Sequence, residues 1–165
     1  RPTGPNQGIS AKLLDKGHDL IISNMLGSYC DYPHAYITAK MIYEWPVIPQ
    51  KCESLRTQTA EHILGVECLV WTEHIRDAAT LERLAWPRFA AKAERAWCGD
   101  SSPGYKDFVR RMKVLFPYLC SKAPHATPPS GWKPGLLRGA REMLAFMKNV
   151  SQSDRKGYQQ AQAEV

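Results

Sequence analysis

Short apolar runs and segments of helical spacing alternate through the first half of the chain. Ile9–Lys16 places apolar residues at helical intervals and is followed by Gly17, which predicts a helix with a glycine stop. Two apolar runs, Asp19–Asn24 and Val66–Trp71, are bounded by turn-forming or polar residues. Runs of this length and composition are typical of strands that are buried on both faces, as in a parallel sheet.

The segment between these two runs, residues 27–50, is rich in tyrosine and proline and has weak periodicity. It predicts a long functional loop with one helical turn around Tyr36–Tyr43. From Asp77 the pattern becomes helical, with Asp77 or a nearby threonine as the cap. Pro87 should interrupt this helix. The strongly helix-forming run Ala90–Trp97 then resumes it.

Two further helices are predicted in the last third of the chain. Tyr105–Leu119 carries apolar residues along one helical face, which indicates an amphipathic helix of about four turns. Residues 121–135 are rich in proline and glycine and are interpreted as a linker. Leu137–Met147 marks another helix, and the polar tail from Ser151 is expected to fray.

The order helix, strand, long loop, strand, helices predicts an α/β fold. Two short buried strands cannot close a sheet, because each buried parallel strand needs neighbours on both sides. The pattern therefore indicates two consecutive units of a TIM-type (β/α)8 barrel, although 165 residues are too few for a whole barrel of about 250. The opening residues, RPTGPNQG, resemble neither a signal peptide nor an initiator sequence, and suggest a piece of a longer protein.

Charge and cysteine content narrow the class of function. The formal net charge is +6, and the basic residues are spread out, which favours solvated helix faces over a nucleic-acid site. The residues so interpreted are Arg76, Arg83, Arg88, Arg95, Arg110, Arg111, Lys133, Arg138 and Arg141. No run approaches the ~20 apolar residues of a membrane span. The five cysteines form no C-x-x-C pair, so neither a zinc site nor another metal is expected, although one disulfide pair remains open.

Four residues at the ends of the predicted strands are candidates for chemistry. Tyr29 and Asp31 follow the first strand, and Trp71 and Glu73 end the second. In a parallel barrel such positions lie at the functional edge, and residues spaced by two point the same way in extended backbone. An indole face with carboxylates suits a carbohydrate. Packing at the rim of the core, with Glu73 as a surface residue beside His74, explains the same pattern.

Four segments, taken together, resemble a known family. They are SYCDYP (28–33), YEWPVIP (43–49), HILGVECLVWTE (62–73) and WPRFAAKAERAW (86–97). In order and spacing they are similar to the C-terminal part of the catalytic domain of glycoside hydrolase family 20, the β-N-acetylhexosaminidases, over about residues 11–119. The resemblance implies that the chain holds the last two strand–helix units of the barrel in residues 1–120. Residues 121–165 would then form a linker, a terminal helix and a polar tail.

The resemblance also implies roles for the candidate residues. The family removes terminal non-reducing N-acetyl-β-D-hexosamines by substrate-assisted retaining catalysis, in which the acetamido oxygen of the substrate attacks the anomeric carbon. Tyr29 would hold that oxygen and stabilise the oxazolinium ion. Asp31 would hold a sugar hydroxyl, Trp71 would wall the acetamide pocket, and Glu73 would grip the outer hydroxyls. No cofactor is implied.

The chain departs from the family at its catalytic Asp-Glu pair, which belongs to an upstream strand. No Asp-Glu dipeptide occurs here, and Glu94 is interpreted as a structural ion-pairing residue on a helix. The leading hypothesis is therefore a hexosaminidase fragment whose partners are an N-acetylhexosamine-containing glycan and the missing N-terminal part of the barrel. The alternative is a non-catalytic carbohydrate-binding or interaction module. The resemblance implies a secreted, periplasmic or lysosomal location.

Overall fold

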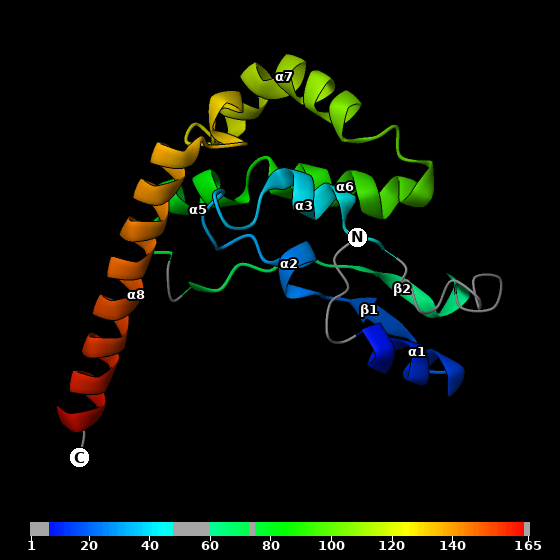
Figure 1. Ribbon diagram of the computed structural model, residues 1–165, viewed down its shortest axis with the longest axis horizontal. Coiled ribbons are helices and arrows are strands. Elements are labelled where there is room, and N and C mark those ends of the chain that lie inside the picture. The colour runs from blue at the N-terminus through cyan, green and yellow to red at the C-terminus, as the bar shows by residue number, and fades with distance from the viewer. Residues whose placement is uncertain (1–6, 48–59, 73–74, 164–165) are drawn as a thin grey trace.

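The computed structural model describes residues 7–47, 60–72 and 75–163, and it is a mixed α/β structure with more helix than strand (Figure 1). Glu73 and His74 lie outside the described residues. The α-helices and strands are α1 Gln7–Asp15, β1 Leu20–Ile22, α2 Met25–Ser28, α3 Ala39–Glu44, β2 Ile63–Val66, α5 Ala78–Ala85, α6 Arg88–Cys98, α7 Tyr105–Lys122 and α8 Leu136–Ala163. Short 3-10 turns occupy Ala60–His62, Gly99–Ser101 and Pro129–Gly131.

The two strands pair in parallel, with Leu20 opposite Ile63 and Ile22 opposite Val66. The second strand was predicted at Val66–Trp71, and these bounds were wrong, because β2 begins three residues earlier and ends five residues earlier. The reason is that β1 ends at Ile22 and the chain then turns into α2. The residues after Val66 therefore have no strand beside them with which to continue the hydrogen-bond ladder. The pairing returns only as a single parallel bridge between Tyr29 and Leu69.

Side-chain caps start the two helices that lie between the strands. The Asn24 side chain accepts from Leu26 N at 3.2 Å and begins α2. The Thr38 hydroxyl accepts from Met41 N at 3.1 Å and begins α3, within the helical turn predicted around Tyr36–Tyr43. Local sequence therefore fixes both helix starts inside a segment whose periodicity is weak.

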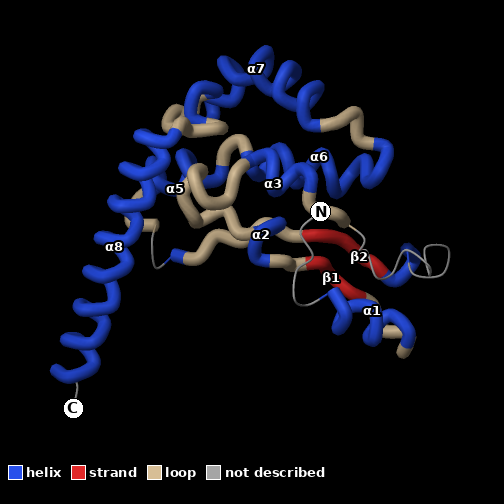
Figure 2. Tube along the Cα trace, in the orientation of Figure 1, coloured by secondary structure: helices blue, strands red, loops and turns tan. Residues whose placement is uncertain are grey.

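The core lies between the helices rather than on the sheet alone. Its buried residues come from the loop after α2, from α3, α6 and α7, and from the segment before α8: Cys30, Ile37, Ile42, Tyr43, Ala91, Phe108, Met112 and Trp132. Figures 1 and 2 show α3 and α6 side by side between the strands and α7. Pro87 separates α5 from α6, as predicted, because α5 ends at Ala85 and α6 begins at Arg88.

The segment after α7 packs onto this core. Trp132 is 3% exposed, its indole N–H donates to Thr127 O at 2.7 Å, and its ring meets Phe116 edge-on at 6.2 Å. Residues 121–135, predicted as a linker, thus include a core anchor. The division of the chain into 1–120 and 121–165 stays a prediction.

α8 is longer than its apolar pattern predicted. It continues through Ser151 to Ala163, where a frayed tail was expected. The stripe that suggested the helix is exposed at Leu137 and Met147, while Phe146 packs on Tyr32 at a ring distance of 5.3 Å. Within the described parts of the chain, no helix combines the length and the apolar character needed to cross a bilayer.

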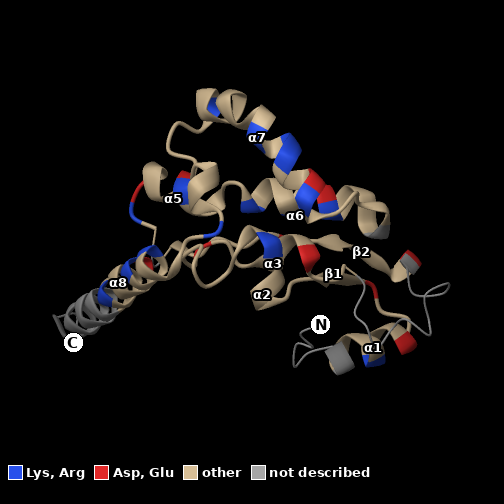
Figure 3. Cartoon of the chain, turned by 45° about the horizontal axis from the view of Figure 1, so that its top comes forward, with Lys and Arg blue, Asp and Glu red and all other residues tan. Residues whose placement is uncertain are grey.

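The basic residues are distributed over several helices (Figure 3). Most of those interpreted as solvated are exposed or half-buried, as predicted. Arg88 is the exception, because it is 0% exposed, and the interpretation of this residue was wrong. A buried guanidinium needs a hydrogen-bond acceptor for each of its donors, and the acceptors for Arg88 come from the loop that carries the candidate site.

Candidate functional site

Backbone pairing brings the two predicted strand ends together. Cys30 N donates to Leu69 O at 2.8 Å, and Leu69 N donates to Ser28 O at 2.9 Å. These bonds set Tyr29 beside Leu69 and leave Trp71 two residues further along. The carboxyl ends of parallel strands meet at one edge of a sheet, which is where α/β proteins bind ligands.

Three of the four predicted residues meet at this edge. The Tyr29 and Trp71 rings lie 6.1 Å apart at an interplanar angle of 51°, and Asp31 Oδ2 accepts from Trp71 N at 3.1 Å. The Trp71 side chain is 47% exposed and Asp31 is 2% exposed, so an open indole face lies beside a buried carboxylate. Glu73, the fourth residue, lies outside the described residues.

Aromatic rings continue from this pair toward α8. Tyr29 stacks on Tyr32 at 6.3 Å with 28° between the rings, and Tyr32 contacts Tyr36 at 5.5 Å. Phe146 of α8 closes the row on Tyr32. Sequence analysis did not single out Tyr32 or Phe146, although the density of tyrosines in SYCDYPHAY was a signal for the former.

Arg88 holds the loop that carries these residues. Its Nη2 donates to Cys30 O at 2.8 Å and its Nη1 donates to Tyr32 O at 2.7 Å and Ile37 O at 2.9 Å. Nε and Nη2 donate to Leu84 O at 2.8 and 2.5 Å. Burial lowers the pKa of Arg88 to about 10, and the guanidinium stays charged at neutral pH. All five of its N–H donors are thus used to fix the backbone on both sides of Asp31.

A second polar network fixes α3, α6 and α7 to one another. Glu94 Oε1 accepts from Tyr43 Oη and from Arg111 Nη2, each at 2.7 Å. The hydrogen bond from Arg111 lowers the pKa of Glu94, while burial and the contact with Glu94 raise the pKa of Tyr43. The prediction that Glu94 is a structural ion-pairing residue is confirmed.

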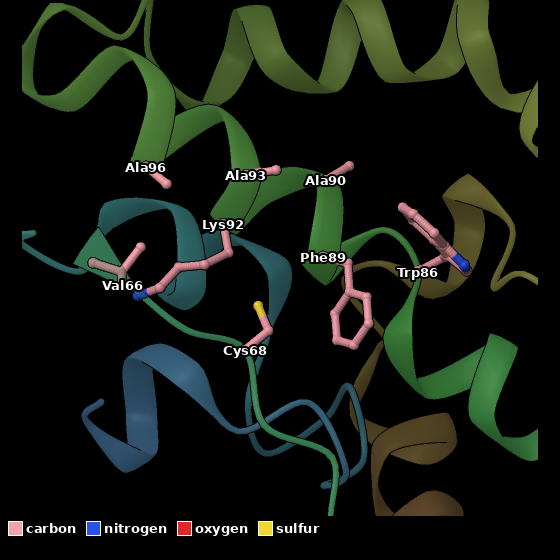
Figure 4. Close-up of a pocket in the computed structure, with 8 residues that line it drawn as sticks. All are labelled: Val66, Cys68, Trp86, Phe89, Ala90, Lys92, Ala93 and Ala96. Atoms are coloured by element: carbon pink, nitrogen blue, oxygen red, sulfur yellow. The ribbon is translucent and has the colours of Figure 1, made fainter. Parts of the chain in front are cut away.

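A cavity of about 320 Å³ lies away from the predicted residues, between α6 and the chain after β2 (Figure 4). Its walls are mainly apolar, and Figure 4 shows the Lys92 side chain running from α6 toward Val66. Burial lowers the pKa of Lys92. Cys68 also lines this cavity, and its Sγ lies 3.9 Å from that of the buried Cys30, with both thiols free. None of the four predicted residues lines it.

Comparison with known proteins identifies relatives for most of the chain. Residues 4–100 match the model of the glycosyl hydrolase family 20 catalytic domain. The chain is 36% identical over 83 residues to a β-N-acetylhexosaminidase of Cellulomonas fimi, covering 48% of this chain and 17% of the relative. It is 33% identical over 113 residues to the chitooligosaccharidolytic β-N-acetylglucosaminidase of Bombyx mori, covering 61% of this chain and 18% of the relative.

A solved structure shares the fold. The β-N-acetylhexosaminidase of family 20 from Streptomyces coelicolor A3(2) superimposes with a TM-score of 0.65 at 23% identity, over 81% of this chain and 28% of that one. The chain spans about a fifth of the length of the curated relatives it matches. Because the family model matches more than half of the chain, the chain belongs to glycosyl hydrolase family 20 and corresponds to part of its catalytic domain.

Proposed function

We propose that this chain supplies one side of the substrate pocket of a β-N-acetylhexosaminidase. The observation that carries the proposal is the meeting of Tyr29, Asp31 and Trp71 at the carboxyl edge of two parallel strands in a chain of this family. The exposed indole offers a flat apolar face to the sugar or its acetamide, and the carboxylate offers acceptors for hydroxyl groups.

In this proposal the phenol of Tyr29 donates a hydrogen bond to the acetamido oxygen of the substrate. That bond orients the internal nucleophile and stabilises the charge that develops as it attacks the anomeric carbon. Asp31 and Glu73 hold hydroxyl groups of the terminal sugar. The general acid and the residue that orients the acetamide come from another part of the protein, because no Asp-Glu dipeptide occurs in this chain.

The remaining strands of a (β/α)8 barrel complete the site. Among the described residues, β1 and β2 pair only with each other, and Ile21 and Leu64 are 59% and 66% exposed. Exposed aliphatic residues on strands with open edges are a surface for further strands. We therefore propose that the upstream part of the same protein packs there.

The test is hydrolysis of 4-nitrophenyl N-acetyl-β-D-glucosaminide by the complete polypeptide that contains these residues. Tyr29→Phe removes only the hydroxyl and should lower kcat by about 10²–10³, the usual effect of losing one transition-state donor. Tyr118→Phe, on an exposed tyrosine of α7, should leave kcat unchanged. Binding of N-acetylglucosamine without any hydrolysis would instead support a non-catalytic binding module.

A further inference from the structure

A second cavity lies between α8, α5 and the loop after α2, and it shares Asp31 with the candidate site. Its volume is about 280 Å³, and its lining includes Asp31, His34, Arg83, Thr127, Arg138 and Glu142 but neither Tyr29 nor Trp71. Figure 1 shows α8 beside α5, and α8 lies outside the residues that match the family model. The volume is close to the lower end of the ~300–1,000 Å³ of small-molecule sites, which suits a monosaccharide-sized ligand.

His34 lines this cavity and carries an unused acceptor. The residue is 4% exposed, and its Nε2 lies 2.8 Å from the carbonyl oxygen of Arg83. A carbonyl can only accept, so Nε2 carries the ring proton and Nδ1 is a bare acceptor. No donor among the described residues reaches Nδ1. Burial lowers the pKa of His34 to about 3, which keeps the ring neutral and this tautomer in place.

Glu142 of α8 also lines the cavity and carries a second unused acceptor. Its Oε1 accepts from Arg138 Nε at 3.1 Å, whereas its buried Oε2 receives no hydrogen bond from the part of the chain that the structure describes. A buried acceptor without a donor is destabilising, because it has lost its hydrogen bonds to water and gained none in return. Two such acceptors, contributed by a loop and by a distant helix to one cavity, indicate a ligand that donates hydrogen bonds.

The charges of the lining restrict the class of that ligand. Asp31 and Glu142 are balanced formally by Arg83 and Arg138, so the cavity has no net preference for an ion. A sulfate or phosphate would bring acceptors to a bare imidazole nitrogen and a carboxylate oxygen. A hydroxyl group both donates and accepts, and it matches the acceptors as well as the guanidinium donors. Leu84, Ala145 and Phe146 add an apolar wall.

We propose that this cavity binds a neutral, hydroxyl-rich molecule of monosaccharide size, whose hydroxyl groups donate to His34 Nδ1 and Glu142 Oε2. The cavity shares Asp31 with the edge that carries Tyr29 and Trp71, but the two acceptors that define it belong to other residues, and binding there does not depend on hydrolysis. Failure of the hydrolysis assay would therefore leave it standing.

The test is an NMR titration of the complete polypeptide, labelled with ¹⁵N-histidine, with D-glucose as the probe. The His34 Nδ1 resonance, assigned from its loss in His34→Gln, should move upfield and saturate as Nδ1 accepts a hydrogen bond. Glu142→Gln should weaken binding about tenfold, the loss expected for one hydrogen bond to a charged acceptor. Glu44→Gln is the matched control, because Glu44 forms an exposed i,i+4 pair with Lys40 far from the cavity.

Ala145→Leu provides a second variant, which fills the cavity from the exposed side of α8 without removing a polar group. It should abolish the response to glucose. The proposal is overturned if the Nδ1 resonance of the folded protein does not respond to glucose. It is also overturned if Glu142→Gln and Ala145→Leu both titrate at the same midpoint glucose concentration as the parent protein. The same holds if inorganic sulfate, and not glucose, gives the saturable shift.

Discussion

Gly27 of α2 shows how closely the loop before the candidate site is packed. A Cβ atom at this position would lie 2.4 Å from Cγ of the Trp45 indole, which is 5% exposed. A contact this short forces either the indole or α2 to move. Because Tyr29 caps the C-terminus of α2, that movement reaches the candidate site directly.

We therefore expect Gly27→Ala to lower the free energy of unfolding by about 1–3 kcal/mol, the usual cost of overpacking. Gly135→Ala is the control, because this residue is exposed and nothing lies within 4 Å of its added Cβ. Urea denaturation of the two variants measures the difference. Equal stability of both would contradict the close approach of Trp45.

His34 should make stability depend on pH. Burial lowers its pKa in the folded protein to about 3, against about 6.5 in an unfolded chain. Between these values the unfolded state binds more protons, so stability falls as the pH falls below about 6.5 and the loss is complete only near pH 3. The contribution of the neutral, buried His34 to stability is fully present above about pH 6.5, the pKa of histidine in the unfolded chain.

The unfolding free energy of the parent protein should thus drop more steeply from pH 7 to pH 5 than that of His34→Gln, whose amide N–H can keep the bond to Arg83 O. A single proton gives at most about 1.4 kcal/mol per pH unit. Urea titrations at several pH values measure both slopes. Identical slopes would show that protonation of His34 does not cause the pH dependence of stability.

The element that positions the site is α6, through a single side chain. Arg88 begins this helix and bonds four backbone carbonyls, three of them in the loop that carries Asp31. Loops are usually more mobile than the elements they connect, and a bidentate fork in their middle is a direct way to stiffen one. Arg88 therefore positions the loop, and its effect on a ligand is indirect.

Arg88→Lys should keep the charge and lose most of this fixation, because an ammonium has three donors where the guanidinium has five. Each buried carbonyl left without a donor costs about 1–3 kcal/mol, so the unfolding free energy should fall by about 2 kcal/mol or more. Arg110→Lys, on an exposed face of α7, is the control. Calorimetric melting of both variants tests this, and an unchanged Tm in Arg88→Lys would refute it.

At the scale of the whole molecule, the described strands form a two-stranded sheet. Two parallel strands bury little surface by themselves, and isolated pairs of strands are marginal in water. Here α6 packs against β2, while Ile21 and Leu64 remain exposed. A barrel that continues beyond both edges would bury these two side chains.

This arrangement predicts that Leu64→Ala costs the complete polypeptide about 2–5 kcal/mol of unfolding free energy, the range for a buried leucine. Leu137→Ala, on the 82% exposed residue of α8, should cost less than about 0.5 kcal/mol. Chemical denaturation compares the two. Small and equal costs would mean that no further strand covers β2.

The kinds of elements could be predicted from the sequence because they depend on neighbours along the chain. The spacing of Leu81 and Leu84, the capping side chain of Asp77 and the break at Pro87 define α5 and α6 locally. The apolar run Asp19–Asn24 marked β1, whereas the run that begins at Val66 meets β2 only at its last residue. Tyr29, Asp31 and Trp71 could be chosen because carboxyl ends of parallel strands share an edge.

What only the tertiary structure decided are the relations between residues far apart in the chain. The register of β2 depends on where β1 turns into α2, so its start at Ile63 could not be read from the apolar run. Trp132 lies in a proline-rich stretch, yet it is a core residue because its ring packs on Phe116 and its indole N–H donates to Thr127 O. The burial of Arg88 and the cavity lined by His34 and Glu142 likewise arise from contacts between residues far apart in the chain. Periodicity records which face of an element is apolar, whereas burial of a polar group is decided by partners that folding brings from elsewhere.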